Sequence, residues 1–123
     1  MLVPADGVEG VKNAVLEIVK HAGPNPCPPI VLGVGIGGTM DQAAVMSKKA
    51  LLRDISTPHK DPEYAKLEEE ILEMVNKTGI GPQLGGTTTC IGVNIEWGAT
   101  HIAGLPVAVT IMCHAARHKH VVL

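Results

Sequence analysis

The sequence predicts an α/β fold, with α+β as the alternative, in which helices pack on a small sheet. The chain has 123 residues, enough for a single domain with a modest core. Hydrophobic residues make up 46% and charged residues 18%, which excludes a disordered chain. Patterns typical of helices and strands follow one another in the order helix, short strand, helix, helix, strands. This order favours helices layered on a sheet over a helix bundle.

Three segments have the residue spacing and end signals of amphipathic helices. They cover residues 7–22, 39–53 and 61–79. The first is ended by Gly23 and a following proline. The second begins at Thr39, and Gln42 three residues later completes a capping box. The third begins with Asp61 as the cap and Pro62 at the first helical position.

Three segments are rich in Val, Ile and Thr and predict strands. They cover residues 30–32, 87–96 and 105–113. A glycine cluster at 33–38 follows the first and fits the G-x-G-x-x-G pattern of dinucleotide-binding folds. A nucleotide is disfavoured because that strand is short and because no apolar strand follows the next helix. The cluster is better explained as an amide-rich loop beside an anionic group, such as a substrate carboxylate or a cluster sulfur, than as a closely packed strand-to-helix turn.

Charge and composition exclude several classes of partner. The net charge is −2, and the chain holds one Trp, one Tyr and no Phe, so nucleic acid is not an expected ligand. Residues 1–10 lack the basic and apolar regions of a signal peptide. The sequence also contains no stretch of about 18 apolar residues, the length needed to span a membrane. We therefore expect a cytoplasmic protein with free thiols.

Three cysteines are the most informative residues. An odd number excludes a closed set of disulfides. Cys90 lies in an apolar run and is expected to pack in the core. Cys27 among three prolines and Cys113 at the end of a strand are better placed as ligands, which suggests an iron–sulfur cluster. A zinc site remains open, built from Cys27, Cys113, His114 and His118. His101 precedes a strand and is either a backbone-bonded loop residue or a substrate contact.

Four motifs occur together and in order. They are Asn25-Pro26-Cys27-Pro28-Pro29, Gly33-Val34-Gly35-Ile36-Gly37-Gly38, Thr100-His101-Ile102-Ala103-Gly104-Leu105-Pro106-Val107 and Cys113-His114-Ala115-Ala116-Arg117. In combination they resemble the α subunit, or N-terminal domain, of the class I iron–sulfur-dependent fumarate hydratases. The α subunit of L(+)-tartrate dehydratase is closely similar. The resemblance implies that residues 1–123 form a single domain, the C-terminal portion of a larger iron–sulfur hydro-lyase α subunit.

The resemblance also implies a cofactor and a site. In the family three cysteines hold a [4Fe–4S] cluster with one open iron. Cys27 and Cys113 match two of them, and the third is expected upstream of this segment. His101 matches a histidine that contacts the substrate, whereas Cys90 falls where the family has a small residue. The loop at 81–86 is one residue shorter than the family pattern.

The implied reaction is the reversible hydration of fumarate to (S)-malate, a step of the tricarboxylic acid cycle, with the open iron as Lewis acid. The β subunit or C-terminal domain is the expected partner in a homo- or hetero-oligomer, and this segment alone is expected to be inactive. L(+)-tartrate dehydration and a non-catalytic metal-binding or interaction domain are the alternatives. Four cations are candidates for contacts with the dicarboxylate or another subunit, or are simply solvated or interfacial charges: Lys48, Lys49, Arg53 and Arg117.

Overall fold

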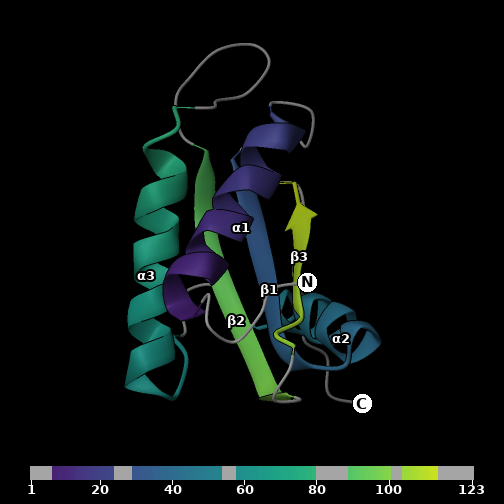
Figure 1. Ribbon diagram of the computed structural model, residues 1–123. Coiled ribbons are helices and arrows are strands. Elements are labelled where there is room, and N and C mark those ends of the chain that lie inside the picture. The colour runs from purple at the N-terminus through teal and green to yellow at the C-terminus, as the bar shows by residue number, and fades with distance from the viewer. Residues whose placement is uncertain (1–6, 24–28, 54–57, 80–88, 101–103, 114–123) are drawn as a thin grey trace, which may run out of the picture.

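Three helices pack on a three-stranded mixed sheet in the computed structural model of the chain (Figure 1). The structure describes residues 7–23, 29–53, 58–79, 89–100 and 104–113. In chain order the elements are α1 (Gly7–Ala22), β1 (Ile30–Gly38), α2 (Met40–Ala50), α3 (Pro62–Asn76), β2 (Cys90–Thr100) and β3 (Val107–Met112). The α/β prediction is therefore confirmed, and so is the predicted order of the elements.

The strands lie in the order β2-β1-β3, so β1 is central. β1 runs parallel to β2 and antiparallel to β3, and Val34 lies opposite Ile95 on one side and Val109 on the other. Side chains alternate between the two faces of a strand, so each face of β1 packs against a different layer. α1 and α3 cover one face of the sheet, and α2 packs on the other (Figure 1).

The core between the sheet, α1 and α3 is almost entirely aliphatic. It consists of Val11, Val15, Val19, Ile30, Leu32, Val34, Ile36, Leu67, Ile71, Val75, Cys90, Val93 and Ile95. In α1 the buried residues recur every four positions, as expected for one stripe of a helix. The near absence of aromatic residues in the sequence is thus matched by a core of small branched side chains.

Both helix starts that the sequence predicted from caps are confirmed. The backbone N–H of Gln42 donates to Thr39 Oγ1 at 3.3 Å, and Thr39 N–H donates to Gln42 Oε1 at 2.9 Å. These reciprocal bonds form the capping box of α2. At α3, Asp61 Oδ1 accepts from the N–H of Glu63 at 3.0 Å. Each cap satisfies N–H groups that have no partner within the helix.

The predicted strand at 30–32 was too short, because β1 continues through the glycine cluster to Gly38. The glycines lack side chains on the face that α2 covers, so the backbone of α2 lies directly on the strand at these positions. A Cβ on Gly33 would lie 2.1 Å from the carbonyl oxygen of Ser47, and a Cβ on Gly35 would lie 2.0 Å from that of Ala43. The expected amide-rich loop is therefore wrong, because the cluster is part of a strand. The close packing of the alternative interpretation is present, but in a strand and not in a turn. Among the described residues no strand follows α2, so the dinucleotide pattern is not completed.

The outer edge of β2 is covered by a buried carboxylate of α3. Glu68 is 6% exposed, and its Oε2 accepts the N–H of Ile95 at 2.7 Å. Its Oε1 accepts the N–H of His59 at 2.9 Å. Arg53 forms ion pairs with Glu68 and, at 3.4 Å, with Glu96. The guanidinium of Arg53 therefore has an internal partner, a role that differs from both roles the sequence suggested for it.

Candidate functional site

The two described cysteines, Cys90 and Cys113, lie at the same end of the sheet. β1 and β2 both begin there, with Ile30 opposite Cys90, and β3 ends there, with Met112 opposite Val31. The C-terminal ends of α1 and α3 lie at the same end (Figure 1). We call it the cysteine end of the sheet. It is the amino end of the parallel pair, so the site differs from those of open parallel sheets, where ligands bind at the carboxyl ends.

Cys113 lies at the cysteine end because it directly follows the last residue of β3. Its side chain is half-buried. Cys27 lies outside the described residues, but it precedes Ile30 by only three positions. The sequence thus brings Cys27 to within three positions of the first residue of β1, and Cys113 follows the last residue of β3 at the same end of the sheet.

An asparagine that the sequence reasoning did not single out fixes the geometry of this end. Asn76 Oδ1 accepts the N–H of Thr89 at 3.1 Å and that of Cys90 at 2.9 Å. Its Nδ2 donates to the carbonyl oxygen of Cys90 at 3.0 Å. The side chain thus joins the end of α3 to the start of β2 on either side of residues 80–88, which lie outside the described residues. An Asn in the last turn of a helix just ahead of a glycine-rich loop is the signal that could have identified it.

Cys90 has the packing role that the sequence predicted. Its side chain is 2% exposed and belongs to the aliphatic core. The thiol donates to the carbonyl oxygen of Gly92 at 3.1 Å. Burial raises the pKa of the Cys90 thiol to about 11, because the thiolate would lose its hydration. A buried neutral thiol is unsuited to ligation, which requires the thiolate.

The raised pKa of Cys90 predicts a loss of stability at alkaline pH. The pKa of Cys90 in the folded state lies above its ordinary value of 9.0. The neutral thiol therefore contributes its full share of the free energy of unfolding below about pH 9, and this share is lost as the pH rises through about 11. Two pKa units correspond to about 3 kcal/mol. Urea unfolding at pH 8 and pH 11 should show a larger loss in the wild type than in Cys90→Ala. The raised pKa of Tyr64 lowers stability at high pH to the same extent in the wild type and in Cys90→Ala, so it cancels in the comparison. Equal losses of stability in the two proteins would contradict the raised pKa of Cys90.

His101 lies outside the described residues, and its neighbours lie at the other end of the sheet. Thr100 is opposite Gly38, where β1 and β2 end, and β3 begins nearby at Val107. From Val107 to Cys113 the strand rises about 3.3 Å per residue, roughly 20 Å in total. The structure therefore does not bring the described neighbours of His101 together with Cys113.

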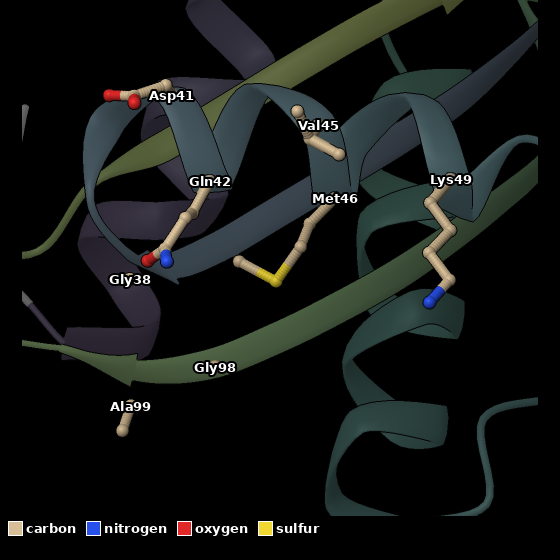
Figure 2. Close-up of a pocket in the computed structure, with 8 residues that line it drawn as sticks. All are labelled: Gly38, Asp41, Gln42, Val45, Met46, Lys49, Gly98 and Ala99. Carbon is tan, nitrogen blue, oxygen red and sulfur yellow. The ribbon is translucent and has the colours of Figure 1, made fainter.

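A hollow of about 520 Å³ opens beside α2 at the end of the sheet nearest Thr100 (Figure 2). Its lining consists of Gly38, Asp41, Gln42, Val45, Met46, Lys49, Gly98 and Ala99. Met46 extends toward Gly98, and the Lys49 side chain marks the far end of the hollow. Lys49, one of the four cations that the sequence suggested, thus lines this hollow. Lys48 is exposed on α2, and Arg117 lies outside the described residues.

Within the described ranges, no three His, Cys, Asp or Glu side chains are grouped so that they could hold a metal ion. The histidines considered for a zinc site, His114 and His118, lie outside those ranges, as does the short loop at 81–86. In the same part of the chain, no helix has both the length and the apolar character needed to cross a membrane.

Comparisons with known proteins are consistent and cover nearly the whole chain. The family model described as "Fumarate hydratase (Fumerase)" matches residues 1–122. The "Putative L(+)-tartrate dehydratase subunit alpha" of Methanocaldococcus jannaschii is 54% identical over 118 residues, which is 95% of this chain and 41% of that protein. The "L(+)-tartrate dehydratase subunit alpha" of Escherichia coli K12 is 43% identical, over 95% of this chain and 39% of its own length.

The chain thus spans about two fifths of the length of the curated relatives that it matches. The resemblance noted from four short motifs extends through all the helices and strands described above. Because the family model matches residues 1–122 of 123, the chain belongs to the fumarate hydratase (Fumerase) family.

Proposed function

We propose that this chain is part of the α subunit of a hydro-lyase that reversibly hydrates fumarate to (S)-malate and depends on a [4Fe–4S] cluster. The observation that carries the proposal is the family match over residues 1–122. The half-buried thiol of Cys113 lies beside the start of β1, the strand that begins three positions after Cys27, and supports it. The reaction needs a group that polarises the departing hydroxyl, a base for the adjacent carbon and cations for two carboxylates. Residues beyond this chain, including those of a β subunit, are proposed to supply the base and most of the cations.

The thiols fit part of the ligand set of such a cluster. Cys113 is half-buried at a strand end, and Cys27 precedes the start of β1 by three positions in the sequence, so both are proposed as ligands. Cys90 is not, because its thiol is buried and bonded to Gly92. The third thiolate is proposed to come from outside residues 1–123. When bound, the cluster supplies an open iron that serves as a Lewis acid toward the substrate. The Asn76 bonds hold the start of β2 in place beside this end.

His101 is proposed, from its match to the family motif alone, to bind a carboxylate of the substrate through a charge-assisted hydrogen bond. Its described neighbours lie at the opposite end of the sheet from Cys113 and give this proposal no support. Replacing His101 with Asn should lower kcat/KM for fumarate by about 10- to 100-fold, the cost of losing a hydrogen bond to a charged group. Iron and sulfide content should stay at the wild-type level. Steady-state kinetics of the assembled enzyme under anaerobic conditions measure this. An unchanged kcat/KM would remove His101 from the proposed site.

L(+)-tartrate dehydration is the second candidate, because the relatives named above are described as tartrate dehydratase subunits. The deciding experiment assays the complete α and β subunits, reconstituted anaerobically, with fumarate, (S)-malate and L(+)-tartrate. We expect fumarate hydration to have the highest kcat/KM and the 123-residue chain alone to show no turnover, since it offers only two proposed ligands. A preference for tartrate would establish the second candidate. Absence of turnover in a cluster-loaded assembly would favour a non-catalytic domain.

A further inference from the structure

The two outer strands of the sheet, β2 and β3, differ in how their outward backbone groups are bonded. On the edge of β2, the Glu68 carboxylate accepts the N–H of Ile95, and the Asn76 side chain bonds the N–H and the carbonyl oxygen of Cys90. β3 forms the opposite edge, and its only strand neighbour in the described part of the chain is β1. An open edge presents backbone groups that a further strand can pair with, so natural sheets cover it or place charges on it.

The register shows which backbone groups of β3 face outward. The N–H of Gly37 donates to the carbonyl oxygen of Pro106 at 2.8 Å. Directly opposed residues of an antiparallel pair alternate between bonded and non-bonded pairs. Gly37 and Pro106 form a bonded pair, so every second residue of β3 after Pro106 is bonded as well. The backbone N–H and C=O groups of Ala108, Thr110 and Met112 therefore bond to β1. Those of Val107, Val109 and Ile111 therefore point away from the sheet, as a row of three donors and three acceptors.

The side chains of β3 favour pairing with another strand. The strand reads Val-Ala-Val-Thr-Ile-Met and contains no charged residue and no proline. The side chains of Val107, Val109 and Ile111 are half-exposed and pack against the rim of the core. On the other face Thr110 Oγ1 lies 2.7 Å from Ser47 Oγ of α2, which ties the strand to the layer beneath. The edge is thus held in register by both layers while its outward groups have no partner among the described residues.

We propose that the outer edge of β3 pairs with a strand from the portion of the subunit that the relatives possess and this chain does not match. That portion is about three fifths of each relative, because the match covers 41% and 39% of their lengths. The three strands that the described residues form are also fewer than the four to six of a typical sheet. The added strand would be apolar on the side of α1, where it extends the core, and would bind mainly through its backbone. The proposal rests on the chain being part of such an α subunit, as proposed above, but the pairing requires neither a cluster nor a substrate.

The test replaces the matched segment of the Methanocaldococcus jannaschii relative with this chain, which its 54% identity makes feasible. Amide exchange is then measured at single residues in the cluster-free, monomeric chimera. The outward N–H groups of Val107, Val109 and Ile111 should exchange at least about 100-fold more slowly than unpaired amides. Ala108 and Thr110, which bond β1, are internal controls and should be protected as well. Fast exchange at the three outward positions beside a protected Thr110 would overturn the proposal.

Proline variants give an independent measurement. Val109→Pro removes an outward N–H and leaves the ladder with β1 intact, whereas Thr110→Pro removes a ladder bond. In the chimera both variants should lower Tm. In the isolated chain Thr110→Pro should lower it far more than Val109→Pro. If the outward amides are protected in the isolated monomer, or only in a dimer of the isolated chain, the occupant is the chain's own tail or a second copy. Either result would contradict the proposal.

Discussion

Replacing Gly35 with alanine is expected to destabilise the fold by about 3 kcal/mol, a large fraction of the stability of a small domain. The added Cβ would lie 2.0 Å from the carbonyl oxygen of Ala43 and 2.7 Å from the backbone nitrogen of Ser47. Both atoms belong to the backbone of α2, so no side-chain rotation relieves the overlap. The whole helix would have to move away from β1. Urea unfolding of the chain, followed by circular dichroism, measures the change in the free energy of unfolding.

Gly98→Ala is the matched control. A Cβ at Gly98 would meet the Sδ of Met46 at 3.6 Å, which is an ordinary contact with a flexible side chain. Its effect should stay within about 1 kcal/mol. Equal unfolding midpoints for Gly35→Ala and the wild type would show that α2 does not lie on β1 at this distance.

Cys113→Ala, introduced into the complete α and β subunits, should reduce fumarate hydration by about 10³-fold or more. Cys27→Ala should have the same effect, because both thiolates are proposed to hold one cluster. The Lewis acid of a hydro-lyase contributes several kcal/mol to the transition state, and 4 kcal/mol corresponds to about 10³-fold in rate. Anaerobic assays of fumarate hydration measure the loss directly.

Cys90→Ala is the control for the removal of a thiol. Cys90 is buried in the core, so its loss should cost about 1–2 kcal/mol of stability through the cavity it leaves. Activity per folded enzyme should be retained. If Cys90→Ala abolished activity and Cys113→Ala did not, the ligand assignment would be wrong.

The helices were predictable from the sequence because their signals are local. α1 has the predicted bounds, and both the Thr39 and Asp61 caps form as expected. β1 was underestimated because glycine ordinarily breaks strands, and what keeps Gly33 and Gly35 in this one is the backbone of α2. That backbone lies on β1 only in the tertiary structure, so no local pattern could have revealed it.

At the candidate site too, local sequence predicted some features, whereas others depend on the tertiary structure. The packing role of Cys90 followed from its apolar neighbours, and the structure confirms it. The contacts of Asn76 with the start of β2 join positions 13 and 14 residues apart across a glycine-rich loop, and local patterns do not report them. The open edge of β3 depends on strand order, which the sequence did not predict. The ligand roles of Cys27 and Cys113 and the substrate contact of His101 stay predictions.

Anaerobic iron and sulfide analysis of the complete α and β assembly tests the central claim most directly, since it measures ligation without relying on turnover. The wild type and Cys90→Ala should contain roughly four iron and four sulfide per assembled pair, as a [4Fe–4S] cluster requires. Cys27→Ala and Cys113→Ala should both lose most of that content while remaining folded. A full complement of iron and sulfide in both variants would contradict the claim that this chain supplies two ligands of the cluster.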